Sequence, residues 1–339
     1  MYATGNKKIL NMLILQLLET NTDENHSLSQ QEIVRLLNVN YGMACDRRSV
    51  KNNIMYLKEL GYDISTEHGY RLLSRTFDEA ELRMLIDSVL FSKGISTKQA
   101  QGLIKKLQSL ASKYFKMKVS YVINVQELQH SDNRQVMYTV DALNDAIEQK
   151  LKVSFTYNDV GLDFKLKPRR KMPNIVNPYQ IVAGNGWFYL IGNVDRYDDV
   201  AHFRIDRMTN VIVLEEGVKP MKEIPELKEG LNLPKHMAEH IYMFSGESVI
   251  VKMLARDDMM NDLTDWFGHD FSILEHKAGK LLIRLTCNED AMRYWALQFG
   301  PYVEILEPES LRNQLLKDVE GMVKKYQKVD LEDLNGNHK

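Results

Sequence analysis

The sequence predicts an α+β protein of several domains, in which a helical N-terminal unit precedes linking helices, a small β-barrel and a C-terminal α/β unit. Apolar residues recur at helical spacing as far as about Lys118, and strand-like alternation replaces that spacing from Leu151 onward. The 339 residues also exceed the usual size of one domain, roughly 100 to 200 residues. Several separate cores are therefore expected.

The first 75 residues are expected to form three helices and a β-hairpin. The first helix covers residues 7–20, the second begins after Ser29, and the third covers about 46–60. Ser29 and Glu32 have the spacing of a capping box, in which each residue satisfies a free backbone N–H of the other. A hairpin pattern follows over residues 62–73. This order is typical of a winged helix-turn-helix.

The third helix carries the candidate DNA contacts. Val50, Ile54 and Leu57 form its buried stripe, which leaves basic and amide side chains on its other faces. Such a helix can be merely a solvated surface helix, but its place as the third of three, directly before a hairpin, favours DNA binding. Arginine can pair with guanine and asparagine with adenine. The predicted DNA-binding residues are Arg47, Arg48, Lys51, Asn52 and Arg71.

Helical spacing continues over residues 77–118, with a break at Gly94, and predicts two linking helices. Beyond a further helix around Leu143, several short apolar runs alternate at period two and are separated by turn signals such as Gly184-Asn185-Gly186. This pattern predicts a small, strongly bent sheet or barrel.

Two segments of the predicted barrel are unusually cationic. Lys165, Lys167, Arg169 and Lys171 fall on one side of an extended chain, which is either a basic stripe for a ligand or a charged edge strand that resists aggregation. Residues 202–207 alternate as well. A barrel core accounts for Phe203 and Ile205 of that segment but poorly for its two arginines, Arg204 and Arg207.

The last part of the chain, after linker-like residues 222–234, reads as strand, helix, two strands, helix and strand, followed by a C-terminal helix over about 308–326. The order β-α-β-β-α-β is that of a ferredoxin-like unit.

The middle of the chain resembles a WYL domain. Trp187-Phe188-Tyr189-Leu190 is similar to the name-giving strand, with Phe188 where the family often has Trp, and residues 202–208 are similar to the downstream motif. The resemblance extends over nearly the whole chain, because many proteins of this family join a winged helix-turn-helix, a WYL barrel of Sm-like topology and a C-terminal extension.

The resemblance implies a bacterial one-component regulator that binds double-stranded operator DNA. Its barrel is expected to take a negatively charged ligand, such as single-stranded nucleic acid or a nucleotide. Guanidinium groups chelate phosphate oxygens, and aromatic rings stack on bases. By position, the implied ligand-binding residues are Tyr157, Arg169, Tyr189, His202, Arg204 and Arg207.

Two of these assignments have open alternatives. Arg207 can form a salt bridge with Asp206 or another acidic residue, and Tyr157 can be a core tyrosine with its hydroxyl satisfied. A homodimer is also implied, on the resemblance and the usual symmetry of operators, since no heptad seam is visible. The alternative function is a nucleic-acid-sensing adaptor that acts through protein contacts rather than operator binding.

Composition and motifs exclude other classes. A formal net charge of −2 and a pI near 6.5 argue against a general polyanion binder, so any nucleic-acid surface must be local. No phosphate-binding loop, dinucleotide fingerprint, zinc-protease motif or nucleophile elbow is present, so neither an enzyme nor a cofactor is predicted. His236 and His240 have a spacing that can bind metal, but without a third ligand in reach they are expected to be surface residues of a linker.

No apolar run approaches the roughly 20 residues of a membrane span, and no signal peptide is visible, so a cytoplasmic protein without membrane contact is expected. We assign residues 1–75 to the DNA-binding domain, 76–134 to a helical linker, 135–220 to the ligand-sensing barrel, 221–330 to the ferredoxin-like extension and 331–339 to a disordered tail.

Overall fold

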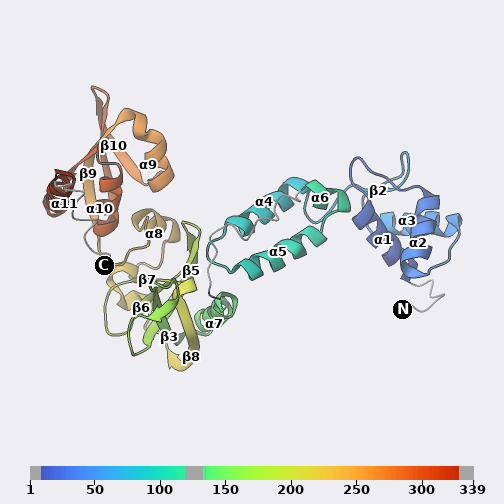
Figure 1. The fold of residues 1–339 in the computed structure, drawn as a ribbon, viewed down its shortest axis with the longest axis horizontal. Coiled ribbons are helices and arrows are strands. Elements are labelled where there is room, and N and C mark those ends of the chain that lie inside the picture. Colours follow the sequence, from blue (N-terminus) through green and yellow to red (C-terminus); the bar gives the residue numbers. More distant parts are fainter. Residues whose placement is uncertain (1–8, 119–132, 134, 328–339) are drawn as a thin grey trace, which may run out of the picture. The chain divides into compact units, whose positions relative to one another are not determined.

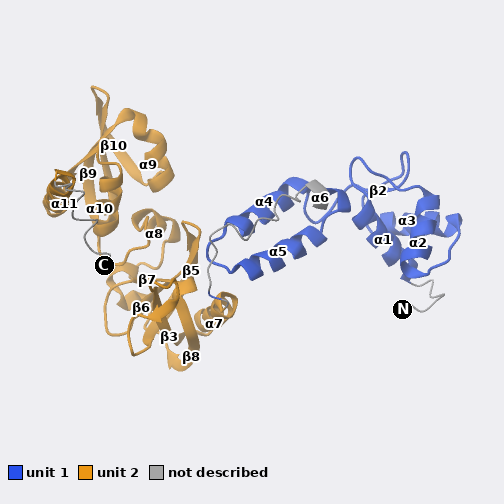
Figure 2. Cartoon of the chain, viewed as in Figure 1, with its two compact units in different colours: residues 1–134 blue, residues 135–339 orange. Residues whose placement is uncertain are grey.

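The computed structural model describes residues 9–118, 133 and 135–327. The chain divides into two compact units, residues 1–134 and residues 135–339 (Figure 2). Both contain helices and strands, so the fold is mixed α+β. The expected tail over 331–339 lies outside the described residues, as does part of the expected linker over 76–134.

Unit 1 begins with three helices and a short hairpin, in the order that the sequence predicts. The elements are α1 (Leu10–Asn21), α2 (Gln30–Tyr41), α3 (Arg47–Glu59), β1 (Ile64–Ser65) and β2 (Arg71–Leu72). The predicted capping box is confirmed, because the Ser29 side chain accepts from the Glu32 amide while Glu32 accepts from the Ser29 amide at 2.8 Å. An isolated bridge pairs Leu28 with Tyr70 beside the hairpin.

The rest of unit 1 is helical. Helices α4 (Glu79–Phe91) and α5 (Thr97–Ser109) lie side by side (Figure 1), and both start at capping boxes, at Asp78 and Ser96. The sequence predicts these two helices, and the structure adds a short third one, α6 (Lys113–Lys118). Helix α6 returns to α1, and the Tyr114 ring stacks on His26 with 3.6 Å between ring centres.

Unit 2 opens with a helix and a curled half-barrel sheet in which every pair of neighbouring strands is antiparallel (Figure 1). Helix α7 (Val136–Gln149) packs on β3, β5 and β8. The strands are β3 (Leu151–Val160), β4 (Leu166–Pro168), β5 (Asn174–Gly184), β6 (Trp187–Val194), β7 (Ala201–Arg204) and β8 (Met208–Gly217). The order is β4-β3-β5-β6-β7, and β8 also pairs with β3, so the long β3 joins both parts of the sheet.

The segment after β8 packs on the barrel. It contains two short 3₁₀ turns and α8 (Leu233–Glu239). Ile224, Leu227 and Met243 are buried together with Tyr179 and Tyr189 of the sheet. Residues that look linker-like in the sequence thus complete an apolar core, and the domain boundary that we expected at 220/221 stays a prediction.

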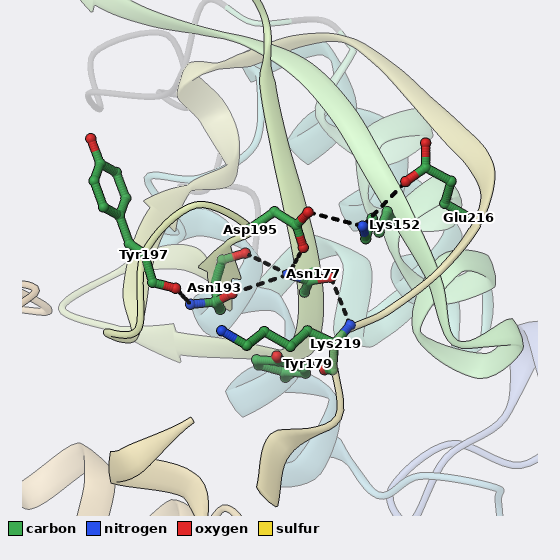
Figure 3. A network of polar contacts seen from close by, with 8 residues as sticks. All are labelled: Lys152, Asn177, Tyr179, Asn193, Asp195, Tyr197, Glu216 and Lys219. Atoms are coloured by element: carbon green, nitrogen blue, oxygen red, sulfur yellow. Dashed lines mark hydrogen bonds and ion pairs between the residues drawn. The ribbon is translucent and has the colours of Figure 1, made fainter. Parts of the chain in front are cut away.

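A buried amide network fixes the barrel strands (Figure 3). The Asn177 amide nitrogen donates to Asn193 and to the Asp195 carboxylate at 3.0 and 3.1 Å, and its oxygen accepts from the Lys219 backbone amide at 2.9 Å. Asn193 in turn donates to two carbonyls of the following turn. Gly192 permits this closeness, since a Cβ there would lie 2.7 Å from the Asn177 carbonyl oxygen. The network ties β5, β6 and the chain after β8 together.

The C-terminal part of unit 2 has the predicted order of elements. These are β9 (Ser248–Arg256), α9 (Met260–Phe267), β10 (Phe271–Lys277), β11 (Lys280–Asn288), α10 (Glu289–Gln298), β12 (Val303–Glu307) and α11 (Glu309–Gln327). The strands form an antiparallel sheet of order β10-β11-β9-β12, and its core includes the fully buried Trp295 and Phe267. Over the described ranges, no helix is both long and apolar enough to cross a membrane.

Candidate functional site

Helix α3 presents a cationic and amide surface. Val50, Ile54 and Leu57 are buried as predicted. The candidates Arg47, Arg48, Lys51 and Asn52 are all exposed in its first two turns, where their spacing puts them on one side of the helix. Four of the five predicted DNA-binding residues therefore share one surface.

The fifth, Arg71, is half-buried and is held locally. Its Nη1 donates to the Glu24 carbonyl at 2.9 Å, and its buried Nε has no hydrogen-bond partner in the described part of the chain. Arg71 thus ties β2 to the loop before α2.

Tyr157 is the centre of the predicted ligand site. Its hydroxyl accepts a hydrogen bond from the Arg204 backbone amide at 3.2 Å, and its ring packs edge-to-face against Phe203. Burial raises the pKa of Tyr157, while the charges of Arg207, Arg169 and Arg204 act in the opposite direction. Three guanidinium groups therefore lie within electrostatic reach of one phenol.

Arg169 follows the edge strand β4. Its guanidinium carbon lies 5.0 Å from the centre of the Tyr157 ring, a cation–π contact. The same group makes a bidentate ion pair with Asp159, with N–O distances of 2.6 to 3.1 Å. Arg169 therefore pairs with an acidic neighbour beside the edge strand and also contacts Tyr157 of the candidate site, so both interpretations of the basic stripe apply to it.

Arg204 is held flat by two neighbours. Its guanidinium carbon lies 3.4 Å from the ring centre of Trp187, and Asp206 accepts from it twice, at 3.0 and 2.8 Å. The side chain of Asp206 is only 9% exposed, so this pair is largely removed from water. Asp206, which the sequence offered as a partner for Arg207, thus binds Arg204.

Arg207 retains a donor that the described residues do not use. Its Nε is buried without a hydrogen-bond partner among them. A buried unpaired donor is costly unless a ligand or water satisfies it. Arg207 is therefore the guanidinium best placed to receive a new acceptor.

Tyr189 completes the group. It is buried, it lies directly opposite Arg204 in the β6–β7 pairing, and burial raises the pKa of its phenol. The structure thus brings together five of the six predicted ligand-binding residues. Trp187, Asp159 and Asp206 contact the arginines of the same group, and none of the three was predicted from the sequence as a ligand-binding residue.

His202 lies apart from that group in a cluster of three imidazoles. Its Nε2 is 2.8 Å from Nε2 of His236, and its ring centre is 4.9 Å from that of His240. The expectation that His236 and His240 are surface residues is wrong, since they are 8% and 2% exposed. Helix α8 turns these residues toward β7 because Leu233 and Met237 pack on the barrel core.

Within the residues that the structure describes, no group of three or more His, Cys, Asp or Glu side chains has an arrangement that could hold a metal ion. The rings of His202 and His236 are hydrogen-bonded directly to each other, so the cluster is a hydrogen-bonded imidazole group.

The buried imidazoles predict a pH effect on stability. Burial lowers the pKa of His236 to about 4 and that of His202 to about 2, both below the ordinary value of 6.5. Below pH 6.5 the unfolded chain binds protons that the folded chain does not, so stability is lost as the pH falls from 6.5 toward 4. We expect a loss of about 2 kcal/mol per histidine between pH 7 and pH 5 in urea unfolding.

His236→Gln should make that dependence shallower, while substitution of the exposed His269 by glutamine should leave it unchanged. An unaltered slope in His236→Gln would contradict this account of the cluster.

Comparison with known proteins identifies two domains in unit 2. Residues 138–213 match the WYL domain, and residues 247–323 match the WCX domain. All the clustered residues, from Tyr157 to Arg207, lie inside the first of these ranges.

Relatives of the whole chain are distant. YobV of Bacillus subtilis strain 168, named as an uncharacterised HTH-type transcriptional regulator, is 21% identical over 299 residues, which are 83% of this chain and 90% of that protein. Among solved structures, proteasome accessory factor B/C (PafBC) of Arthrobacter aurescens is 16% identical with a TM-score of 0.30, over 93% of this chain and 48% of that chain. A CRISPR Cas-related protein is 18% identical with a TM-score of 0.39, over 76% of each chain. The chain thus spans about half the length of the PafBC protein.

Proposed function

The chain belongs to the family of WYL domain-containing transcriptional regulators, and from that premise we propose that it is a DNA-binding regulator whose barrel senses an anionic ligand. One observation carries the proposal: Arg169, Arg204 and Arg207 gather around Tyr157 inside the WYL domain. Such a group favours a phosphate-bearing ligand, because guanidinium groups form charge-assisted hydrogen bonds with phosphate oxygens. Aromatic rings and guanidinium planes also accept stacked bases, which favours single-stranded nucleic acid or a nucleotide. The proposed role needs no enzymatic activity.

We propose further that residues 1–75 act as a winged helix-turn-helix with α3 in the major groove, as the exposed Arg47, Arg48, Lys51 and Asn52 favour. The C-terminal unit is taken as ferredoxin-like, because its β9–β12 order is that of the βαββαβ motif. A cytoplasmic location accords with this role.

Replacement of Arg48 by alanine is expected to weaken binding to duplex DNA from the gene's own promoter region about tenfold, since one base or phosphate contact is lost. Fluorescence anisotropy at low salt measures the change. Lys105→Ala, which removes an exposed charge from α5, is the matched control. Equal affinities in all three proteins would contradict the role of Arg48, and the absence of duplex binding in all three would argue for the adaptor function instead.

A homodimer is the proposed assembly, and α11 offers a surface for it. Leu316, Val319, Val323 and Tyr326 are between 47% and 79% exposed and follow a 3-4-3 spacing. This is the spacing of a coiled-coil seam, which is too short to stand out in the sequence. A second copy of the chain supplies the same stripe, so the two helices can pair by symmetry. A monomeric mass in light scattering would remove this part of the proposal.

Signalling is proposed to run through the helices of residues 77–118. We call Arg169, Arg204 and Arg207 the arginine group. The charge of a ligand bound there would bias the spacing of the two DNA-binding domains of a dimer and so their fit to successive major grooves.

A further inference from the structure

Two carboxylates lie inside the arginine group, and their surroundings differ. Asp206 binds Arg204 and is 9% exposed, whereas Asp159 binds Arg169 with both side chains almost half exposed, at 47% and 49%. A desolvated pair is costly to break, and an exposed pair contributes little net stability. Asp206 is thus a fixed part of the site, while Asp159 can be displaced from its partner.

Asp159 also lies in the field of a second arginine. The hydrogen bonds from Arg169 are the largest cause of its lowered pKa, and the charges of Arg169 and Arg207 add to that effect. Its carboxylate therefore occupies the neighbourhood in which an anion would meet both guanidinium groups. Arg207 keeps its buried Nε without a protein acceptor there.

We propose that Asp159 is an internal competitor for the ligand's anionic group. Without ligand its carboxylate neutralises Arg169, and an incoming phosphate group takes its place between Arg169 and Arg207. The inference rests on the proposed function and sharpens its ligand class. A phosphate group offers charged oxygens for the carboxylate that it displaces, whereas a neutral nucleoside leaves the Asp159–Arg169 pair intact. The ligand must therefore carry phosphate, and its affinity is reduced by the free energy needed to displace Asp159 from Arg169.

Asp159→Asn tests the proposal, because it removes the charge while keeping the size of the side chain. The probe is a fluorescein-labelled single strand of eight thymidylates, titrated with the full-length protein. We expect about fivefold tighter binding than in the wild type, the change that corresponds to losing one exposed charge pair. The gain should shrink as salt is raised, since the competition is electrostatic.

Asp163→Asn is the matched control. Asp163 lies on the same hairpin and is equally exposed, but its ion-pair partner is Lys167, at 3.2 Å, and not Arg169. Asp163→Asn removes the same charge and should leave the affinity for the oligonucleotide unchanged. An equal gain in affinity in both variants would show a general charge effect and overturn the proposal, as would the absence of a gain in Asp159→Asn.

A second probe separates this inference from the proposed function. If the oligonucleotide binds neither wild type nor Arg207→Ala, the nucleic-acid ligand is wrong. Inorganic phosphate then decides the role of Asp159, since phosphate should raise the melting temperature of Asp159→Asn more than that of the wild type. Equal shifts of the melting temperature in the two proteins would overturn the competitor role of Asp159. If Arg207→Ala loses oligonucleotide binding but Asp159→Asn shows no gain in affinity, the competitor role is overturned while the proposed function stands.

Discussion

Replacing Asn177 with alanine is expected to lower the free energy of unfolding by about 3 kcal/mol, because several buried groups lose a partner at once. Asn177 is fully buried, and its amide serves Asn193, Asp195 and the Lys219 backbone (Figure 3). Alanine can neither donate nor accept, so the Lys219 N–H and the Asp195 oxygen stay desolvated without their best partner. The loss should appear as destabilisation of unit 2.

Urea unfolding followed by tryptophan fluorescence measures this effect, since Trp187 lies in the barrel. Asn174→Ala, three residues earlier on β5 and only partly buried, is the control and should cost much less. If Asn177→Ala unfolds at the same urea concentration as Asn174→Ala, the network does not hold the strands together.

Arg207→Ala is expected to weaken binding of a single-stranded oligonucleotide about tenfold to a hundredfold, the range for loss of a charge-assisted hydrogen bond in a partly buried site. The Nε of Arg207 has no hydrogen-bond partner among the described residues, so its removal should change the thermal stability little. The effect is therefore expected on affinity and not on folding.

The control for this substitution is Arg196→Ala, which removes an exposed charge in the turn between β6 and β7. Binding measured over a range of salt concentrations should show the full loss only for Arg207→Ala. A comparable loss in both variants would mean that overall charge, and no specific arginine, attracts the oligonucleotide.

Local signals made the helices of unit 1 predictable. The Ser29–Glu32 capping box and the Asp46 cap of α3 each join residues three positions apart, so the sequence displays both partners together. The buried stripe of α3 likewise follows from spacing alone. The strand alternation identified the barrel segments for the same reason.

Contacts across the chain were not predictable. His202 contacts His236, which is 34 residues away in the sequence, and Arg204 contacts Trp187 of the neighbouring strand. Which side chains become neighbours depends on strand order and on how α8 packs, and neither is visible in residue spacing. Consequently the arginines were predicted as ligand-binding cations, but Asp206 was offered as a partner for Arg207 and pairs with Arg204, and Asp159 was not considered.

The most direct test of the central claim is the affinity of promoter duplex for the wild type and for Arg207→Ala, each with and without a single-stranded oligonucleotide at a concentration just sufficient to saturate the wild type. We expect the oligonucleotide to change the duplex affinity of the wild type and to have a much smaller effect on that of Arg207→Ala, because this variant is only partly loaded. No change in the wild type, or the same change in both proteins, would contradict the claim that the arginine group of the barrel controls DNA binding.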